Sequence, residues 1–420
     1  MLEYAAYALV LFSLGMYVVL DGYDLGVGML SLAARPERRR EYSEIVATAW
    51  DANESWIILV GVVLWAGLPG VYAVVLPGVY LPLIVMLVSI ILRGLGLEMQ
   101  SAAGGYRRGW ALLFGWASLV ATVCQGLVLG AVLTGPQQHD GTFSGGAFDW
   151  FSLYGVLCAL GAVALYLLAG AAWLQDKTEG WSRSRTLRTG RSLLVATAVM
   201  VLVLGLTLDG ADPQSLHLGD PVRAVLVGLA VAVAVVAGAF AWYGFGRRPD
   251  WRPFAAVTTM TAAGLLGLVA LTAPVVVPPG LTVHQAASPH SSLVFLVLGV
   301  GLCMPFVLAY NFYAWRSFRG KFTDPVETPI PPLPSRVQPL VAPPAPTGAL
   351  RTIVRRVLLV VLGILATGLS QDVFGGVSDL IGPLGVTVLC CAALVAWIAG
   401  DRRDGRAGHF DADAGAETRS

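Results

Sequence analysis

Four carboxylates lie inside the first two hydrophobic stretches of the sequence, where charge is costly. Asp21 and Asp24 fall in the run Asp-Gly-Tyr-Asp-Leu-Gly-Val-Gly, and Asp51 and Glu54 fall in Trp-Asp-Ala-Asn-Glu-Ser-Trp. A charged side chain near the bilayer centre costs roughly 2.5–3.5 kcal/mol on insertion scales, so such residues usually handle ions or protons. The members of each pair are three residues apart and share a helix face. Their spacing indicates reversible protonation by a coupled set of acids.

A cation and several aromatic side chains accompany these acids. Arg93 lies near the end of the third hydrophobic stretch and is the natural counter-ion for one carboxylate, and Glu98 follows it. Trp50 and Trp56 flank the second acid pair and serve either in packing or in lining a path. Gly22 and Gly26 are four residues apart, a spacing of small residues that lets a neighbouring helix approach closely.

Not every acid needs a function. For Asp24 and Glu98 the alternative is that they reach the lipid headgroups, and for Asp21 that it holds an interhelical contact. Asp51 is the strongest candidate, because it is expected deepest in its helix. Asn53 and Ser55 fit a role in bridging helices.

The composition indicates that these residues belong to a membrane protein. Of 420 residues, 56% are hydrophobic and only 13% are charged. Apolar runs of about 20 residues, each long enough to span the bilayer as a helix, recur along the chain. The alternating segments of a membrane β-barrel are absent. We therefore predict an all-α polytopic membrane protein with core helices near residues 4–27, 44–68, 74–98, 110–133, 151–173, 193–209, 222–243, 254–277 and 291–314.

Arginine and lysine collect in every second connection, beginning with Arg35, Arg38, Arg39 and Arg40. The positive-inside rule makes these connections cytoplasmic and places the N-terminus outside. Asp21, Asp24 and Arg93 then lie toward the cytoplasmic ends of their helices. Asp51 is expected about seven residues into the second helix, or roughly 10 Å at 1.5 Å per residue. The intramembrane charges are thus predicted to share one leaflet.

The region beyond residue 321 differs from the nine-helix core. Nine prolines between Pro325 and Pro346 predict an extended linker over 322–350. Two further hydrophobic stretches predict a transmembrane hairpin over 351–400, for eleven membrane helices in all. The polar tail, 401–420, is expected to be disordered and cytoplasmic.

Several chemistries find no support in the sequence. The five histidines, His139, His217, His284, His290 and His409, all lie outside the predicted helices. A haem bound by this chain alone is therefore not expected, because haem needs an axial ligand and buried histidine is the usual one. No glycine-rich phosphate loop indicates an ATP-driven pump. The cysteines lack the spacing of a metal site, and nothing points to nucleic acid.

Motifs at both ends of residues 1–321 resemble subunit II of the cytochrome bd-type quinol oxidases. They are the two acid stretches, Arg93-Gly94 with Glu98, Leu281-Thr282-Val283 with Ala286-Ala287-Ser288, and Asn311-Phe312-Tyr313 with Phe318-Arg319-Gly320-Lys321. One departure is Ala52, where the family usually has glycine after the motif aspartate.

The resemblance implies a haem-free subunit of a terminal oxidase in the bacterial cytoplasmic membrane. Its partner, subunit I, would carry haems b and d and the quinol site, and the complex would oxidise quinol and reduce O2 to water. Asp51 would belong to a proton route, with Glu54, Asp21 and Asp24 as companions. Trp56 and Arg93, with Trp50 and Glu98, would belong to oxygen access or the subunit interface.

The resemblance also allows a structural quinone or lipid in this subunit. It implies a small accessory subunit as a further partner, which the C-terminal hairpin would replace unless the hairpin is a lineage-specific appendage. Two rival functions remain from the residues themselves. A proton-coupled secondary transporter would use buried acids but needs broken helices around a midplane site. A purely structural membrane scaffold would use them only as interhelical hydrogen-bond partners.

Overall fold

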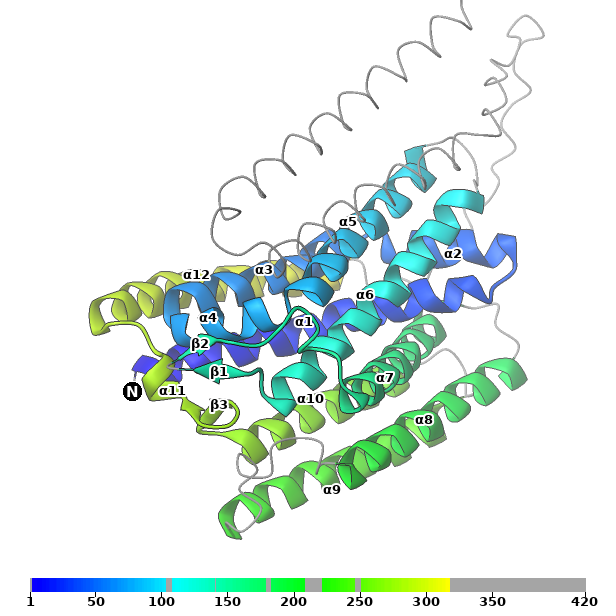
Figure 1. Ribbon diagram of the computed structural model, residues 1–420. Coiled ribbons are helices and arrows are strands. Elements are labelled where there is room, and N and C mark those ends of the chain that lie inside the picture. The colour runs from blue at the N-terminus through cyan, green and yellow to red at the C-terminus, as the bar shows by residue number, and fades with distance from the viewer. Residues whose placement is uncertain are drawn as a thin grey trace, which may run out of the picture. The chain divides into compact units, whose positions relative to one another are not determined.

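The computed structural model describes residues 2–102, 108–139, 141–178, 183–207, 221–245 and 251–317 (Figure 1). These residues all belong to one compact unit, which extends to Ile330. Apart from two small hairpins, the regular structure is helical, which confirms the predicted all-α fold. The predicted linker (322–350), transmembrane hairpin (351–400) and tail (401–420) lie outside the described residues, as do Phe318, Arg319 and Lys321, and these predictions stand untested.

Helices carry most of the described chain. They are α1 (Leu2–Leu32), α2 (Pro36–Val46), α3 (Trp50–Gly67), α4 (Pro69–Gly78), α5 (Tyr80–Ala102), α6 (Arg108–Thr134), α7 (Leu153–Lys177), α8 (Arg183–Leu206), α9 (Pro221–Gly244), α10 (Arg252–Thr272), α11 (Val283–Ala286) and α12 (His290–Ser317). The two antiparallel hairpins pair β1 (Gln138–His139) with β2 (Thr142–Phe143), and β3 (Val275–Val277) with β4 (Leu281–Thr282).

Eight of the described helices are long and apolar enough to cross a membrane: α1, α5, α6, α7, α8, α9, α10 and α12. Four of them, α6, α7, α9 and α12, follow the predicted ranges 110–133, 151–173, 222–243 and 291–314 to within a few residues. Helix α3 has the length of a span, but its first turns carry Asp51, Asn53 and Glu54. Which end of α1 faces the cytoplasm stays a prediction from the positive-inside rule.

The predicted helix over 44–68 is wrong at its start. Helix α2 ends at Val46, and the three residues that follow form a turn before α3 opens at Trp50. The amide of Ala47 donates a hydrogen bond to the carbonyl of Ser43 at the end of α2. The amide of Asn53 donates one to the carbonyl of Ala49 at the start of α3, so the two helices have separate ends. Asp51 therefore lies in the first turn of its helix and not seven residues inside it.

Proline explains two further corrections. The predicted helix over 74–98 is divided at Val79 into α4 and α5, because Pro82 in the first turn of α5 has no amide hydrogen to bond the carbonyl of Gly78. The predicted helix over 254–277 ends at Thr272, because Pro274 cannot continue it and the chain leaves in extended conformation as β3. The carbonyl of Pro274 then accepts a hydrogen bond from the amide of Val283.

The predicted helix over 193–209 begins earlier, as α8 at Arg183.

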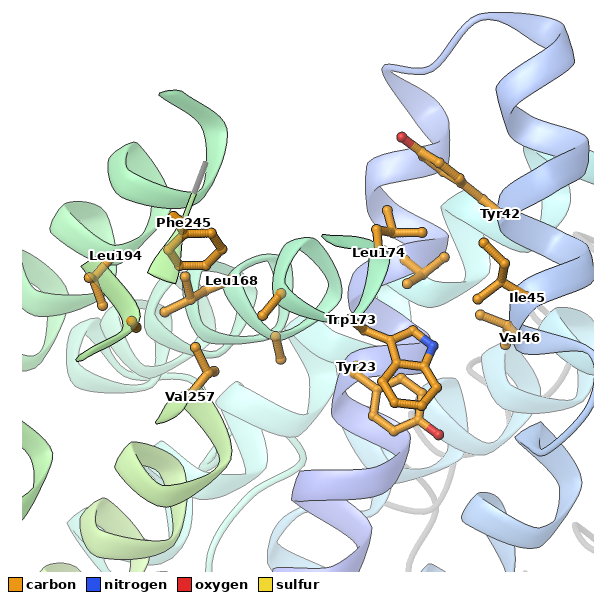
Figure 2. Close-up of a cluster of buried hydrophobic side chains, with 14 of the residues drawn as sticks. Tyr23, Tyr42, Ile45, Val46, Leu168, Trp173, Leu174, Leu194, Phe245 and Val257 are labelled. Atoms are coloured by element: carbon orange, nitrogen blue, oxygen red, sulfur yellow. The ribbon is translucent and has the colours of Figure 1, made fainter. Parts of the chain in front are cut away.

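An aromatic and aliphatic core fixes the end of α1 that carries its two aspartates (Figure 2). Tyr23 of α1 stacks on Trp173 of α7, with ring centroids 4.4 Å apart. Both rings also contact Phe254 of α10. Tyr42 and Val46 of α2 belong to the same buried cluster. The cluster thus ties α1 to α2, α7 and α10 beside the acids.

Helices α1 and α7 approach each other closely at glycine. A methyl group added at Gly26 would collide with the carbonyl of Tyr166 and the amide of Gly170, and one added at Gly170 would meet the backbone of Gly26. The ring of Tyr166 lies against Gly22. The predicted helix approach at Gly22 and Gly26 is confirmed, and it leaves Asp21 and Asp24 in a tightly packed interior.

The two hairpins lie toward the end of the bundle where α1 begins (Figure 1). Gln138 in β1 donates from Nε2 to the carbonyl of Pro278 over 3.0 Å, which joins one hairpin to the other. Ser288 donates from its amide to the carbonyl of Gly67 and from Oγ to that of Ala66. The segment over 274–293 therefore packs on α3, and its Ala286 also lies close to Gly70 of α4.

Candidate functional site: a buried cluster of acids and one arginine

Three helices bring the predicted charges together. Asp21 and Asp24 of α1 and Arg93 of α5 are all fully buried, with no measurable exposure. Glu54 of α3 joins them with 16% of its side chain exposed. Asp21 and Asp24 lie in the second half of α1, toward the end that leads into α2. The structure thus brings together three of the four predicted acids and the predicted cation.

Arg93 is shared by two carboxylates from different helices. Its Nη2 lies 2.6 Å from Oδ1 of Asp21. The same nitrogen contacts Oε1 of Glu54, to which Nε also donates over 3.1 Å. Nη1 has no hydrogen-bond partner among the described residues. The predicted counter-ion role of Arg93 is confirmed, and a buried ion pair of this kind depends on both partners being present.

Asp24 has a different environment. Its Oδ2 accepts a hydrogen bond of 2.7 Å from Nδ2 of Asn53, which also donates to the hydroxyl of Tyr23 over 3.0 Å. Oδ1 of Asp24 is buried with no hydrogen-bond partner among the described residues. Asn53 bridges α1 and α3, as expected for it, whereas Ser55 bonds only its own helix, at the carbonyl of Ala52.

Asp51 is the one predicted acid that the structure leaves out of the buried cluster. It is exposed in the first turn of α3, so its expected position as the deepest acid is wrong. The reason is the break after Val46, which moves the helix start to Trp50. Glu54, one turn further along the same helix, is the member that contacts Arg93.

The remaining predicted residues surround the cluster. Trp50 is half-buried, and its ring lies against Gly94, next to Arg93. Trp56 is 2% exposed and meets Phe12 of α1 edge to face, with centroids 5.8 Å apart. Glu98 is exposed, one turn beyond Arg93 on α5. Trp50 and Trp56 both pack between helices, while Glu98 faces away from the buried acids.

A second buried polar group was missed from the sequence. Gln125 of α6 donates from Nε2 to the hydroxyl of Tyr17 over 2.8 Å and accepts from the hydroxyl of Tyr166, also over 2.8 Å. Tyr17 and Tyr166 are both buried. The available signal was a lone glutamine in an otherwise apolar helix, since polar side chains in membrane helices seek partners. The three residues join α1, α6 and α7 next to Asp21.

Haem binding would require an axial ligand such as histidine from this chain. Among the described residues, no group of three or more histidine, cysteine or acidic side chains could hold a metal ion. His139 lies in β1, His284 in the short helix α11, and His290 is the first residue of α12, which corrects the expected loop positions of the last two. Among the described histidines, none lies beyond the first residue of a membrane-length helix.

Fold and site together define a class of protein: an all-α membrane protein with an ion-paired acid cluster buried between three helices. Residues 2–318 match the family described as cytochrome bd terminal oxidase subunit II. Because the match covers most of the chain, the protein belongs to this family.

Curated relatives carry the same description. "Cytochrome bd-I ubiquinol oxidase subunit 2" of Escherichia coli K12 is 30% identical over 200 residues, which is 45% of this chain and 52% of that protein. The match therefore spans about half the length of that relative. "Cytochrome bd ubiquinol oxidase subunit 2" of Bacillus subtilis 168 is 23% identical over 322 residues, covering 73% of this chain and 92% of the relative.

The fold also has a solved counterpart. The structure titled "The structure of bd oxidase from Geobacillus thermodenitrificans" superposes with a TM-score of 0.62 at 14% sequence identity. The alignment covers 76% of this chain and 98% of that one. At this identity the likeness supports the shared all-α fold alone.

Proposed function

We propose that this chain is the haem-free subunit of a bd-type terminal oxidase that oxidises quinol and reduces O2 to water in a bacterial cytoplasmic membrane. The haems b and d would be held by a partner, subunit I, and would supply the electron transfer and oxygen chemistry. The contributions proposed for this chain are proton delivery, oxygen access and support of the partner. The observation that carries the proposal is the buried cluster of Asp21, Asp24, Glu54 and Arg93 in a chain of this family.

Proton delivery is supported by a gradient of burial among the acids. Asp51 is exposed at the start of α3, Glu54 is 16% exposed one turn later, and Asp21 is fully buried. Asp51 and Glu54 share a helix face, and Glu54 shares Arg93 with Asp21. Protons would thus enter at Asp51 and pass inward through Glu54, with Arg93 holding the two inner carboxylates in place.

Support of a partner is indicated by the exposed face of α3. Asp51, Ser55, Ile58, Val62 and Trp65 are all exposed and recur at the spacing of one helix face. An acid on a lipid-facing stripe is costly, and membrane acids almost always face protein or a water-filled cavity. We therefore assign this stripe to contact with subunit I.

Of the three proposed contributions, oxygen access is supported by the fewest observations. Trp56 is buried against Phe12 on the inner side of α3. An apolar molecule such as O2 partitions into apolar surroundings, and these rings, with the half-buried Trp50, offer them beside the proposed partner face. A structural quinone or lipid in this subunit, and a small accessory subunit, remain compatible with the proposal but carry no part of it.

The test combines co-purification with one substitution. The full chain, purified from its membrane, should bring with it a haem-rich subunit that shows the haem d absorption band. Asp51→Asn should leave that band intact and lower quinol-dependent oxygen consumption, because loss of a group that transfers protons typically costs on the order of 100-fold. Glu44→Gln is the control, since Glu44 is a partly exposed acid on α2 that pairs with Arg40 outside the cluster.

Each outcome separates the proposal from its rivals. Unchanged oxygen consumption in Asp51→Asn would remove Asp51 from the proton route and favour the structural scaffold. A colourless preparation that moves a solute with protons would instead restore the secondary transporter. Membership of the oxidase subunit family leaves that transporter with no observation in its favour.

A further inference from the structure

The buried charges in the cluster do not balance. Among the described residues, three carboxylates, Asp21, Asp24 and Glu54, face one cation, Arg93. Arg93 forms its ion pairs with Asp21 and Glu54, and among the described residues Asp24 forms none. If all three acids were ionised, the cluster would carry an excess of two negative charges, with Asp21 and Asp24 fully buried and only Glu54 partly exposed.

The side chains that face Asp24 cannot neutralise it. Tyr23 and Asp21 come from its own helix, Asn53 and Glu54 from α3, and Arg93 from α5. Asn53 supplies an amide N–H to Oδ2, which is a dipole and not a charge. The two acids only add negative potential, and the guanidinium is already shared between them.

An unpaired ionised carboxylate buried in this way is costly enough that such a group normally becomes neutral instead. Asp24 has no measurable exposure, and its Oδ1 has no hydrogen-bond partner among the described residues. We propose that Asp24 is held as a neutral carboxylic acid in the resting protein and stores one proton for the cluster, while Asp21 remains the fixed anion of Arg93. The storage role rests on the proposed function, whereas the neutral state does not.

The hydrogen bonds also assign the proton to one oxygen. Nδ2 of Asn53 is a donor, so Oδ2 of Asp24 must accept. A carbonyl oxygen is the better acceptor of this bond, so we assign the acid proton to Oδ1, which has no partner among the described residues. Loss of this proton would add one negative charge next to Asp21 and Glu54, so its release is coupled to the protonation of the rest of the cluster.

Infrared spectroscopy of the full chain, purified with the subunits that accompany it, tests the neutral state. Wild-type protein should show the carbonyl stretch of a protonated carboxylic acid, with the small downshift in D2O that marks an exchangeable proton. Asp24→Asn should remove this band, and Asp21→Asn should leave it. An amide resembles a protonated acid in shape and hydrogen bonding, so Asp24→Asn is expected to fold.

Asp24→Glu provides a second variant if the asparagine variant does not assemble. It should shift the band without abolishing it, because the carboxylic acid is kept and displaced by one methylene. A band that survives unchanged in both Asp24 variants, or a wild-type spectrum that lacks it, would overturn the proposal.

Turnover then tests the storage role. Asp24→Asn should assemble with the full haem content of its partner, yet consume oxygen at least about 10-fold more slowly and with an altered pH profile, because a proton-transfer group is missing. Asp24→Glu should restore part of the rate. Loss of the infrared band with unchanged turnover and pH profile would overturn the storage role. If Asp51→Asn were slow in that case, the proposed proton delivery would still hold.

Discussion

Oδ1 of Asp21 and Nη2 of Arg93 lie 2.6 Å apart, and neither side chain is exposed. The two residues come from α1 and α5, so the pair joins helices that are separated by more than seventy positions in the sequence. Glu54 contacts the same nitrogen from α3. One guanidinium thereby holds three helices together at the point where the acids are buried.

Removing Arg93 should destabilise the protein strongly. Arg93→Gln would leave Asp21 and Glu54 without a cation, and breaking a buried ion pair in this way costs about 3–5 kcal/mol. We expect a lower thermal unfolding temperature in detergent and a smaller yield of assembled protein. Arg188→Gln serves as the control, because Arg188 is exposed in α8. Equal stability of the two variants would show that the acids are neutral without Arg93.

The sequence predicted this pair because an arginine and several acids inside apolar helices have few alternatives to one another. It could not place Asp51, because the break between α2 and α3 contains only Ala47, Thr48 and Ala49. This segment has neither glycine nor proline, which are the usual signals for a helix end. The break is instead a tertiary feature, since α2 packs Tyr42 and Val46 into the aromatic core.

The sequence also could not predict that the two aspartates of α1 have different partners. Asp21 and Asp24 are one turn apart with similar neighbours, yet one meets Arg93 and the other meets Asn53. The difference depends on how α3 and α5 are rotated against α1. That rotation follows from side-chain packing, which periodicity alone does not fix.

Gln125 and its two hydrogen-bond partners, Tyr17 and Tyr166, should contribute jointly to the stability of the protein. Gln125→Leu would leave the hydroxyls of Tyr17 and Tyr166 buried without this partner, and each unsatisfied group costs about 1–3 kcal/mol. The triple variant Tyr17→Phe, Gln125→Leu, Tyr166→Phe removes all three polar groups and should recover much of that loss. Thermal unfolding of the single and triple variants measures the difference. A triple variant less stable than Gln125→Leu would mean that the tyrosines have further polar roles.

Trp56 should matter for packing and, separately, for oxygen. Trp56→Ala would leave a cavity beside Phe12 and is expected to cost about 3–5 kcal/mol. Trp56→Phe should keep most of this stability. If Trp56 guides oxygen, the phenylalanine variant should still raise the KM for O2 in the assembled oxidase without changing kcat. Trp116→Ala is the matched control, because Trp116 of α6 is 56% exposed.

The contact of α1 with α7 should tolerate no side chain at Gly26. Gly26→Ala would drive a methyl group into the carbonyl of Tyr166, and this is backbone that cannot rotate away. Overpacking of this kind typically costs about 1–3 kcal/mol, and separation of α1 from α7 would also loosen Tyr23 from Trp173 and so disturb Asp24.

Gly264→Ala is the matched control for Gly26→Ala. Gly264 lies within α10, and an added methyl group would meet nothing within 4 Å. Alanine is also favoured over glycine in a helix by about 1 kcal/mol, so Gly264→Ala should be neutral or stabilising. Thermal unfolding measures both variants, and the infrared band assigned to Asp24 reports whether the acid is still buried. A Gly26→Ala protein as stable as Gly264→Ala would contradict the close approach of the two helices.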